Sequence, residues 1–384
     1  MILKILIDDK TAIIEWYISS EQIFAFIIRR DYSAPIVFDK FTTEDAKELI
    51  KFEKEYFGTY LSDRRSWRSR LDSLLSRLSS ILKVEEIIER YLLDSCEEII
   101  FIPHRTLHIF PMHALPLLNG KCVLDKFPGG VRYSPSCQML KLNSSQGESL
   151  QAFDSLLAVQ NPTEDLGFAD FEVEEIASLF DNKPRVLKRD EARKSDVVNM
   201  QTHSKQRYLH FACHGSFNLG SPLASSLVLA DKQNLTLSEI FSLNLKDAYL
   251  VTLSACETGL TDFRSISDEY VGLPSGFLYA GSSNVVSSLW TVDDLSTAFL
   301  NIQFYINLKD FDRCPNAAVA LNQAQQWLRN ITKKELEIWI AERQFNISST
   351  LRKGLDYRLQ KLSDDDQPFN SPFYWAAFCA IGES

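Results

Sequence analysis

The feature that most constrains the fold is a set of short, almost continuously apolar runs. YLHFACHG (208–215), AYLVTLSAC (248–256) and NVVSSLW (284–290) each have the composition of a strand with apolar residues at neighbouring positions. Such strands are covered on both faces, as in parallel sheets, whereas half-exposed strands alternate polar and apolar residues. Amphipathic helical patterns stand between the runs. The sequence therefore predicts an α/β fold with a largely parallel sheet flanked by helices.

The two ends of the chain differ in their pattern. Residues 12–38 contain two or three strands of a meander, and residues 43–95 carry apolar side chains at helical spacing. A polar, Ser-rich segment at 139–150 is the best linker in the sequence. We therefore expect an N-terminal α/β lobe over residues 1–140 and a larger second lobe over residues 150–384.

The balance of charge argues against a nucleic-acid partner. The 384 residues include 41 Lys and Arg and 51 Asp and Glu, which gives a formal net charge of -10. Phosphate contacts need clustered cations. The one short basic run has the spacing of a solvated helix face and consists of Arg64, Arg65, Arg68 and Arg70.

Two further observations concern the compartment. No apolar run has the length that spans a bilayer, and the N-terminal MILKILIDDK lacks the long apolar core of a signal peptide. The seven cysteines have neither CxxC pairs nor regular spacing, which argues against a disulfide framework and against a zinc site. We expect a cytoplasmic protein with free thiols and no membrane contact.

The sequence predicts no metal and no cofactor. His104, His108 and His113 fall close together, but on a Pro-punctuated loop, and we expect them to cap loops rather than to bind a metal ion. The glycine motifs GxxxxGK[ST] and GxGxxG, which hold phosphates, are absent, as are HExxH and GxSxG.

Two of the predicted parallel strands end in residues whose side chains could take part in catalysis. His214 closes one and Cys256 closes the other, 42 residues later, which leaves room for a strand, a turn and a helix between them. Because active sites of open α/β sheets lie at the carboxyl ends of strands, we expect the two side chains to emerge side by side. A thiolate can attack a carbonyl while an imidazole generates the thiolate and protonates the leaving amine. His214 and Cys256 are thus a candidate catalytic dyad.

A tetrahedral intermediate also needs backbone donors for its oxyanion. Gly215 allows close approach of the backbone to a substrate, so we expect the N–H groups of Gly215 and Cys256 to form the oxyanion hole. The competing interpretation makes the Cys a small buried hydrophobe and the His a satisfied core side chain, and spacing alone does not separate the two. His210 and Cys213 are expected to pack or cap. No residue demands the role of a third, acidic member.

The motifs HFACHG and LSACETG, in this order and at this distance, resemble the signature of CHAT domains. These are caspase-like domains, distantly related to separase and caspases and often attached to tetratricopeptide repeats. The segments IIFIPHRTLHIFPMHAL, SDEYVGLPSGFLYAGSSNVVSSLWTVDD and FYWAAFCAIG resemble further parts of the family, most closely its cyanobacterial members. The resemblance covers nearly the whole chain. It departs from the common pattern at Ile266-Ser267, where many members have Gly-Gly, and at His104-Arg105.

The resemblance implies a caspase-like sheet with a degenerate caspase-like N-terminal lobe. It implies that His214 is the general base and acid and that Cys256 is the nucleophile of a cysteine endopeptidase with a protein substrate. Family members are latent until a signal or partner acts, for example a repeat or sensor subunit, sometimes CRISPR-effector-like, and serve antiphage defence or regulatory proteolysis. The alternative is a catalytically silent interaction or scaffold module with the same fold.

In caspase-like folds the strand that follows the nucleophile's strand, together with its loop, helps to line the pocket for the P1 side chain. Here that strand is NVVSSLW (284–290). Trp290, Asp293 and Asp294 stand there, and Asp268 and Glu269 begin another predicted helix. An acid in the pocket would favour a basic P1 residue through a charge-assisted contact. The alternative is that these acids serve helices as caps or first-turn charges, and we favour a cap for at least one of Asp293 and Asp294. Arg or Lys is the first expectation for P1, and a neutral residue the second.

Overall fold

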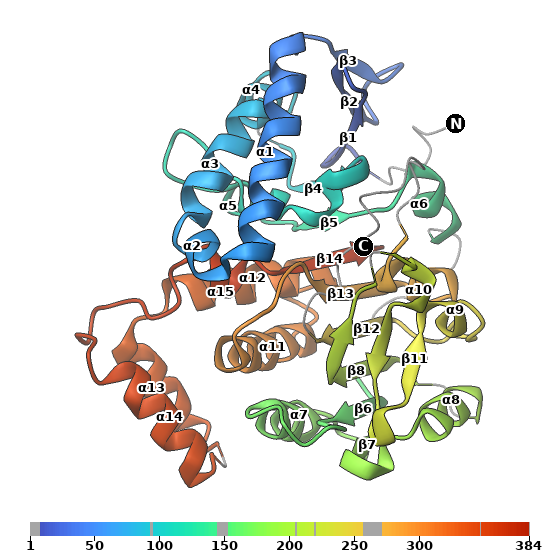
Figure 1. The fold of residues 1–384 in the computed structure, drawn as a ribbon, viewed down its shortest axis with the longest axis vertical. Helices are drawn as coiled ribbons and strands as arrows, with labels where there is room; N and C mark the ends of the chain where they lie inside the picture. Colours follow the sequence, from blue (N-terminus) through green and yellow to red (C-terminus); the bar gives the residue numbers. More distant parts are fainter. Residues whose placement is uncertain are drawn as a thin grey trace.

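A computed structural model describes residues 8–92, 95–143, 153–203, 206–218, 220–255, 271–345 and 347–383. One eleven-stranded sheet runs through the molecule in the order β3-β2-β1-β4-β5-β14-β13-β12-β8-β6-β7 (Figure 1). A second, small sheet has the order β11-β10-β9. Three of the predicted site residues, Cys256, Asp268 and Glu269, lie outside the described residues.

The N-terminal strands form the predicted meander. β1 (Thr11–Ile18), β2 (Ile23–Arg29) and β3 (Ile36–Phe38) pair antiparallel in chain order. β1 also pairs in parallel with β4 (Glu98–Ile102), which pairs in parallel with β5 (Val131–Tyr133).

The later strands form the predicted parallel block. Its members, from the edge inward, are β7 (Arg185–Lys188), β6 (Leu156–Gln160), β8 (Tyr208–Ala212), β12 (Leu250–Ser254) and β13 (Asn284–Ser288). Every residue of β6, β8, β12 and β13 is buried, which confirms the prediction of strands covered on both faces. β14 (Phe378–Gly382) pairs antiparallel with β13 and parallel with β5, so it joins the two halves of the sheet.

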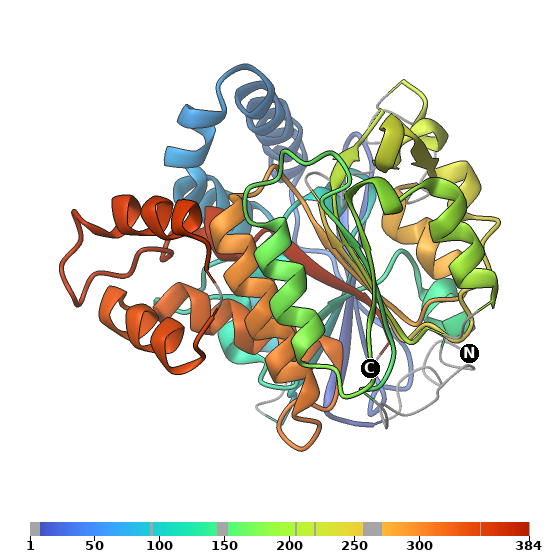
Figure 2. The same cartoon turned by 90° about the horizontal axis from the view of Figure 1, so that it is seen from below.

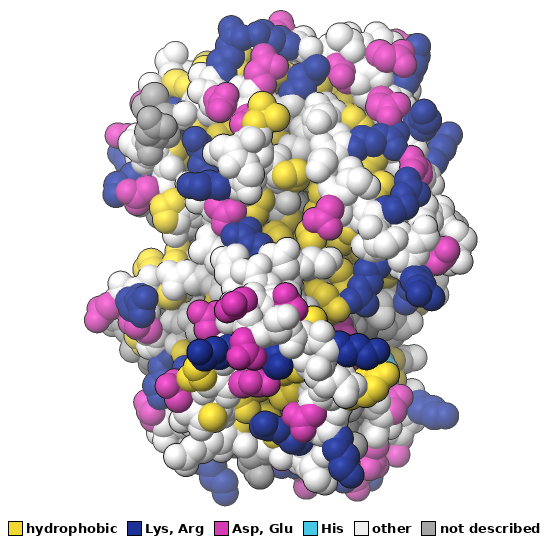
Figure 3. Space-filling model, turned by 90° about the vertical axis from the view of Figure 1, so that its left-hand side faces the viewer, with side chains coloured by type: hydrophobic (Ala, Val, Ile, Leu, Met, Phe, Trp, Pro, Cys, Tyr) yellow, Lys and Arg dark blue, Asp and Glu magenta, His cyan; other side chains and the backbone are white. Residues whose placement is uncertain are grey.

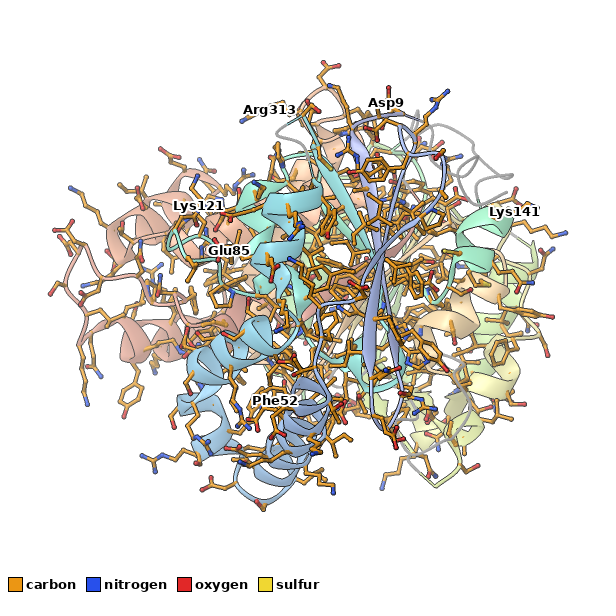
Figure 4. The ribbon with its side chains drawn as sticks, turned by 90° about the horizontal axis from the view of Figure 1, so that it is seen from above. Asp9, Phe52, Glu85, Lys121, Lys141 and Arg313 are labelled. Carbon is orange, nitrogen blue, oxygen red and sulfur yellow. The ribbon has the colours of Figure 1, made fainter. Side chains whose placement is uncertain are left out.

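The first half of the chain supplies helices to both faces of the sheet. They are α1 (Thr43–Ser62), α2 (Arg64–Ser69), α3 (Leu71–Ile81), α4 (Val84–Tyr91), α5 (Val123–Lys126) and α6 (Cys137–Asn143). Figure 4 shows Phe52 of α1 and Lys141 of α6 on opposite sides of the sheet. The predicted linker at 139–150 thus begins inside a helix, and its remainder lies outside the described part of the chain. The division into two lobes stays a prediction, because one sheet runs through both.

The second half contributes α7 (Ala169–Ser178), α8 (Lys194–His203), α9 (Leu237–Ile240), α10 (Leu273–Tyr279), α11 (Asp294–Lys309), α12 (Ala317–Asn330), α13 (Lys333–Glu342), α14 (Ser349–Leu359) and α15 (Pro372–Trp375). Figure 2 shows α7, α11 and α12 on one face of the sheet and α8, α9 and α10 on the other. α13 and α14 project from the body (Figure 1). Thr236 and Glu239 form the expected capping box of α9.

Aromatic side chains tie α1 and α2 to the segment that follows β13. The Trp67 ring lies 5.0 Å from that of Tyr60 and 5.5 Å from that of Trp290. The hydroxyl of Tyr60 accepts a hydrogen bond from the backbone N–H of Thr291 at 3.1 Å. Because both tryptophans are buried, the contact combines area burial with favourable ring geometry.

The surface shows charges of both signs. On the face seen in Figure 3, Lys and Arg side chains are interspersed with Asp and Glu. That face therefore carries no continuous cationic field of the kind that nucleic acid requires. No helix in the described ranges is long and apolar enough to cross a membrane.

Trp67→Ala should destabilise the protein by about 3–5 kcal/mol, because a buried aromatic side chain is replaced by a cavity at the junction between α2 and residue 290. Denaturant unfolding measures the change. The matched control is Tyr279→Ala, since Tyr279 is 69% exposed; it should shift the free energy of unfolding by no more than about 0.5 kcal/mol. Equal effects of the two substitutions would contradict the assignment of Trp67 as a structural anchor.

Candidate functional site

The ends of β8 and β12 meet at one edge of the sheet. The two strands pair in parallel, with Ala212 opposite Ser254, which confirms that they are neighbours. His214 was expected to close β8, but β8 ends at Ala212. His214 stands two residues farther on, at the start of β9 (His214–Ser216). Cys256 follows Ser254 by two positions in the sequence and lies outside the described residues. The structure therefore places His214 beside the strand from which Cys256 continues.

The small sheet holds the backbone at His214. β9 pairs antiparallel with β10 (Ser226–Val228), which pairs with β11 (Asn234–Thr236). Gly215 lies opposite Leu227, whose side chain is buried. The connection from β8 to β12 is thus a three-stranded sheet followed by α9, and not a single strand, turn and helix. The role of the Gly215 N–H as an oxyanion donor stays a prediction.

An acidic residue that the sequence analysis did not assign contacts the histidine. Nε2 of His214 lies 2.8 Å from Oδ1 of Asp165, in the turn between β6 and α7. The Thr163 hydroxyl donates to the same oxygen at 2.5 Å. That hydrogen bond, and after it the bond from His214, hold the pKa of the Asp165 carboxyl below its usual range.

The turn that carries Asp165 is held by an asparagine. Asn161 follows β6 directly, adopts a left-handed φ of 47°, and donates its backbone N–H to the carbonyl of Ala212 at 2.9 Å. Its side chain bonds both backbone groups of Leu166, each at 3.1 Å. Asn tolerates the left-handed region and closes such turns well. The Asn-Pro signal at the end of β6 was therefore the sequence signal from which an acid beside His214 could have been found.

The contact with Asp165 fixes which ring nitrogen of His214 faces away. An ionised carboxylate only accepts hydrogen bonds, so Nε2 must carry the proton in this contact. Nδ1 is then the nitrogen available to another partner. In this orientation the imidazole can take a proton on Nδ1 while Asp165 stabilises the resulting positive charge.

A small cavity of about 30 Å³ lies beside the histidine. Its lining comes from α7, β12, the end of β8 and the start of α11, and includes Glu172, His214, Ser254, Ala255, Val292, Asp294 and Thr297. Two larger hollows, of about 890 and 670 Å³, lie along α12 and contain none of these residues. We identify the candidate site by its chemistry rather than by its size, because the small cavity brings His214 together with the acids Glu172 of α7 and Asp294 of α11.

The two neighbouring aspartates have different roles. Asp293 caps α11 by accepting from the Ser296 N–H at 3.1 Å, and Arg358 of α14 grips both of its oxygens at 2.6 Å. Burial acts to raise the pKa of Asp293, but the Arg358 guanidinium leaves it lowered. Asp294 lies on the rim of the cavity, and burial followed by the like charges of Asp293 and Glu172 raises its pKa. The expectation that at least one of the pair is a cap is confirmed.

Trp290 lies elsewhere than expected. Its ring is buried against Trp67, and its Nε1–H donates to the carbonyl of Phe373 at 3.1 Å. It is not among the described residues that line the cavity. Trp290 therefore packs against α2 and anchors the start of the segment that follows β13, and its ring does not line the cavity.

The two remaining histidine and cysteine candidates near the site are buried. His210 on β8 is fully enclosed, as is Cys213, and burial raises the pKa of the Cys213 thiol to about 12. A thiol with such a pKa is unreactive at neutral pH. Cys213 is thus a packing residue, as predicted.

The three histidines of the N-terminal loop are also enclosed. Nδ1 of His104 accepts the Ile18 N–H at 3.0 Å, and Nδ1 of His113 lies 2.7 Å from the Tyr133 hydroxyl. Burial lowers the pKa of His108 and of His113 to about 3. Within the described ranges no group of three potential ligands could hold a metal ion.

Comparison with known proteins identifies the family. A model of the CHAT domain matches residues 73–383, which is most of the chain. The chain belongs to the CHAT domain family. No curated protein sequence matches it.

Solved structures show the same fold at low sequence identity. Separase of Saccharomyces cerevisiae, in its complex with securin, has a TM-score of 0.56 at 11% identity in one structure and 0.55 at 12% in another. These alignments cover 99% and 85% of this chain, but only 31% and 29% of the separase chain. The Arg-specific cysteine proteinase gingipain R matches at a TM-score of 0.46 and 11% identity, over 81% of this chain and 67% of its own. The CHAT chain thus has an α/β fold like that of the separase structures.

Substitution of the two aspartates should change stability in opposite directions. Asp293→Asn loses the Arg358 ion pair and weakens the cap, so at pH 7 it should cost about 1–3 kcal/mol. Asp294→Asn removes a carboxylate whose raised pKa means that its charge opposes folding as pH rises, so it should raise the melting temperature slightly at pH 7. This gain should disappear at a pH near 3, where Asp294 is protonated in both states. Thermal unfolding at the two pH values tests this, and destabilisation by Asp294→Asn at pH 7 would refute it.

Proposed function

We propose that this CHAT chain is a cytoplasmic cysteine endopeptidase in which Cys256 is the nucleophile and His214 the general base and acid. The observation that carries the proposal is the juxtaposition of His214, oriented by Asp165, with the end of β12, from which the chain continues to Cys256. The free state of all six cysteines that the structure describes is consistent with a reducing compartment.

The reaction follows from the orientation of the imidazole. Nδ1 of His214 takes the proton of the Cys256 thiol, and the thiolate attacks the carbonyl carbon of the scissile peptide bond. The C–N bond then breaks and the leaving amine takes the proton from Nδ1. Water hydrolyses the thioester, which releases the carboxylic acid and restores the thiol. Asp165 holds Nε2 and stabilises the imidazolium that forms, so we extend the dyad by an orienting acid.

Two backbone groups complete the proposal. The N–H groups of Gly215 and Cys256 are the proposed donors to the oxyanion of the tetrahedral intermediate. The pairing of β9 with β10 supports this role for Gly215, because it holds that part of the backbone in one conformation. Preorganised donors of this kind need no rearrangement as charge develops.

We propose that Asp294 selects a basic P1 side chain. Asp293 is occupied by Arg358 and by the helix cap, whereas Asp294 lies on the rim of the cavity that contains His214. The lining residues in the described ranges include Glu172 but no Lys or Arg. An arriving guanidinium or ammonium group would therefore meet negative charge without a competing cation. Asp268 and Glu269 remain further candidates for the same pocket.

Activity is proposed to be latent and released by a partner protein. The yeast separase structures are complexes with securin, and the present chain spans about a third of that separase. By analogy, a protein that is not part of this chain, for example a repeat or sensor subunit, would hold or release the site. Antiphage defence and regulatory proteolysis are the two proposed settings, and a CRISPR-effector-like partner belongs to the first.

The proposed dyad is tested by labelling with a peptidyl-arginine chloromethyl ketone. Wild type should label at Cys256, and Cys256→Ala and His214→Ala should not. Asp165→Asn should slow labelling, and hydrolysis of a peptidyl-arginine fluorogenic substrate, by about 10- to 100-fold, since it keeps the size of the side chain but loses its charge. The control is Glu164→Gln in the same turn, where Glu164 faces Arg189 at 3.7 Å. Equal labelling of wild type and Cys256→Ala would favour the silent scaffold instead.

The proposed P1 preference has a characteristic pH dependence. The ratio of kcat/KM for an arginine substrate to that for a matched alanine substrate should fall as pH drops through the raised pKa of Asp294, which lies above the usual value of about 3.9. The ratio cancels the titration of His214 and Cys256, which both substrates share. In Asp294→Asn the ratio should be about tenfold lower at pH 7 and flat with pH. A neutral substrate that is preferred by both forms would exclude the role of Asp294.

A further inference from the structure

Beneath the candidate site lies a layer of buried polar side chains that the proposed chemistry does not use. Strand alternation places Thr252 and Ser254 of β12 on the face that α11 covers, and His210 of β8 stands opposite Thr252 on the same face. Glu172 of α7 and Asn301 of α11 reach into this layer from the helices, and both are almost completely buried. Buried polar groups are unfavourable unless they are paired, so the layer calls for an explanation.

Asn301 is the centre of the layer. Its Nδ2 donates to Glu172 Oε1 at 2.8 Å and to Ser254 Oγ at 3.1 Å. The Glu172 carboxylate also lies 3.0 Å from Nε2 of His210, although the ring nitrogen is not aligned for a hydrogen bond. Glu172 therefore fixes the Asn301 amide from one side, and the amide holds the hydroxyl of Ser254 on the other.

Ala255, the residue after Ser254, is held by the neighbouring strand β13. Ser288, the last residue of β13, is fully buried and donates its hydroxyl to the carbonyl of Ala255 at 2.7 Å. Ser254 and Ala255 are the two residues that immediately precede Cys256. Both of them also line the cavity beside His214. Two side chains thus hold the chain where it enters the site: Asn301 of α11 through the hydroxyl of Ser254, and Ser288 of β13 through the backbone carbonyl of Ala255.

We propose that Asn301 and Ser288 are positioning residues that set the place of the nucleophile. Asn301, oriented by Glu172, anchors Ser254, and Ser288 anchors Ala255, so that the end of β12, from which the sequence continues to Cys256, is fixed relative to His214. This inference rests on the proposed peptidase function. A displacement of a reacting group by about 1 Å can cost about 100-fold in rate, so small anchors at this point have large effects.

The structure provides a matched control in the same interface. Tyr305 of α11 and Thr252 of β12 share a hydrogen bond of 2.9 Å, and both are fully buried. This bond joins the same helix to the same strand, one helical turn and two strand residues farther from the site. Its loss should cost comparable stability without moving Ser254 or Ala255.

The experiment compares Ser288→Ala and Asn301→Leu with Tyr305→Phe in the full chain. Hydrolysis of the peptidyl-arginine fluorogenic substrate should fall about 10- to 100-fold in kcat for the first two, with KM little changed. Tyr305→Phe should keep kcat within about twofold of wild type, although its melting temperature falls. Ser288→Ala and Tyr305→Phe each remove one buried hydroxyl, so they remain comparable if Asn301→Leu does not fold.

A second measurement reports on geometry directly. Peptide-resolved alkylation of Cys256 with iodoacetamide, followed over pH, depends on how closely His214 supports the thiolate. The alkylation profile of Ser288→Ala should shift to higher pH, and that of Tyr305→Phe should match wild type. If Ser288→Ala and Tyr305→Phe have equal kcat and equal profiles while Cys256→Ala is inactive, the positioning role is wrong and the peptidase stands. If wild type is no more active than Cys256→Ala, the peptidase function itself fails, and this inference with it.

Discussion

The parallel pairing of β12 with β8 is the interaction on which the rest of the site depends. It aligns Ser254 with Ala212, so the two strands end at the same edge of the sheet. A shift of one residue would turn Thr252 and Ser254 toward the opposite face and bring Val251 and Leu253 against α11. The hydrogen bonds of Asn301 and Tyr305 would then be lost. The polar layer and the apolar pattern therefore specify one register together.

Residues 291–294, which follow β13, alternate between side chains that are held by other elements and side chains that line the cavity. Thr291 and Asp293 contact Tyr60 of α1 and Arg358 of α14, whereas Val292 and Asp294 line the cavity. This alternation is that of an extended chain, although no strand is formed there. The N-terminal helices and the projecting α14 thus contribute to the shape of the site without supplying a reacting group.

Sequence reasoning predicted the parts of the fold that follow from local pattern. The apolar runs of β8, β12 and β13 indicate burial on both faces, and the cap of α9 follows from Thr236 and Glu239. The neighbourhood of β8 and β12 followed from the 42 residues between His214 and Cys256, which leave room for the chain to return to an adjacent parallel strand. The short sheet β9–β10–β11 was not predicted as a unit, because strands of three residues carry too little pattern to separate them from loops.

The surroundings of His214 were harder to predict than the pairing of β8 with β12. Asp165 reaches His214 only because Asn161 adopts a left-handed conformation and folds the turn back against β8. Trp290 was expected in the pocket because its position in the chain is adjacent to Asp293 and Asp294, but Trp67, far away in the sequence, covers it. Both outcomes depend on contacts between distant segments, which local pattern does not encode.

The electrostatics of the site connect the proposed base, His214, with the proposed preference for a basic P1 side chain. Asp165, Glu172 and Asp294 lie near His214, and no Lys or Arg stands among the described residues that line the cavity. Asp165 is exposed and stays ionised, so it stabilises positive charge on the imidazole in water. Burial and the like charges of Asp293 and Glu172 raise the pKa of Asp294, and a cation beside it would favour its ionised form. A basic P1 side chain would therefore reduce the unfavourable electrostatic free energy of the ionised Asp294 carboxylate. A neutral side chain of equal size would not.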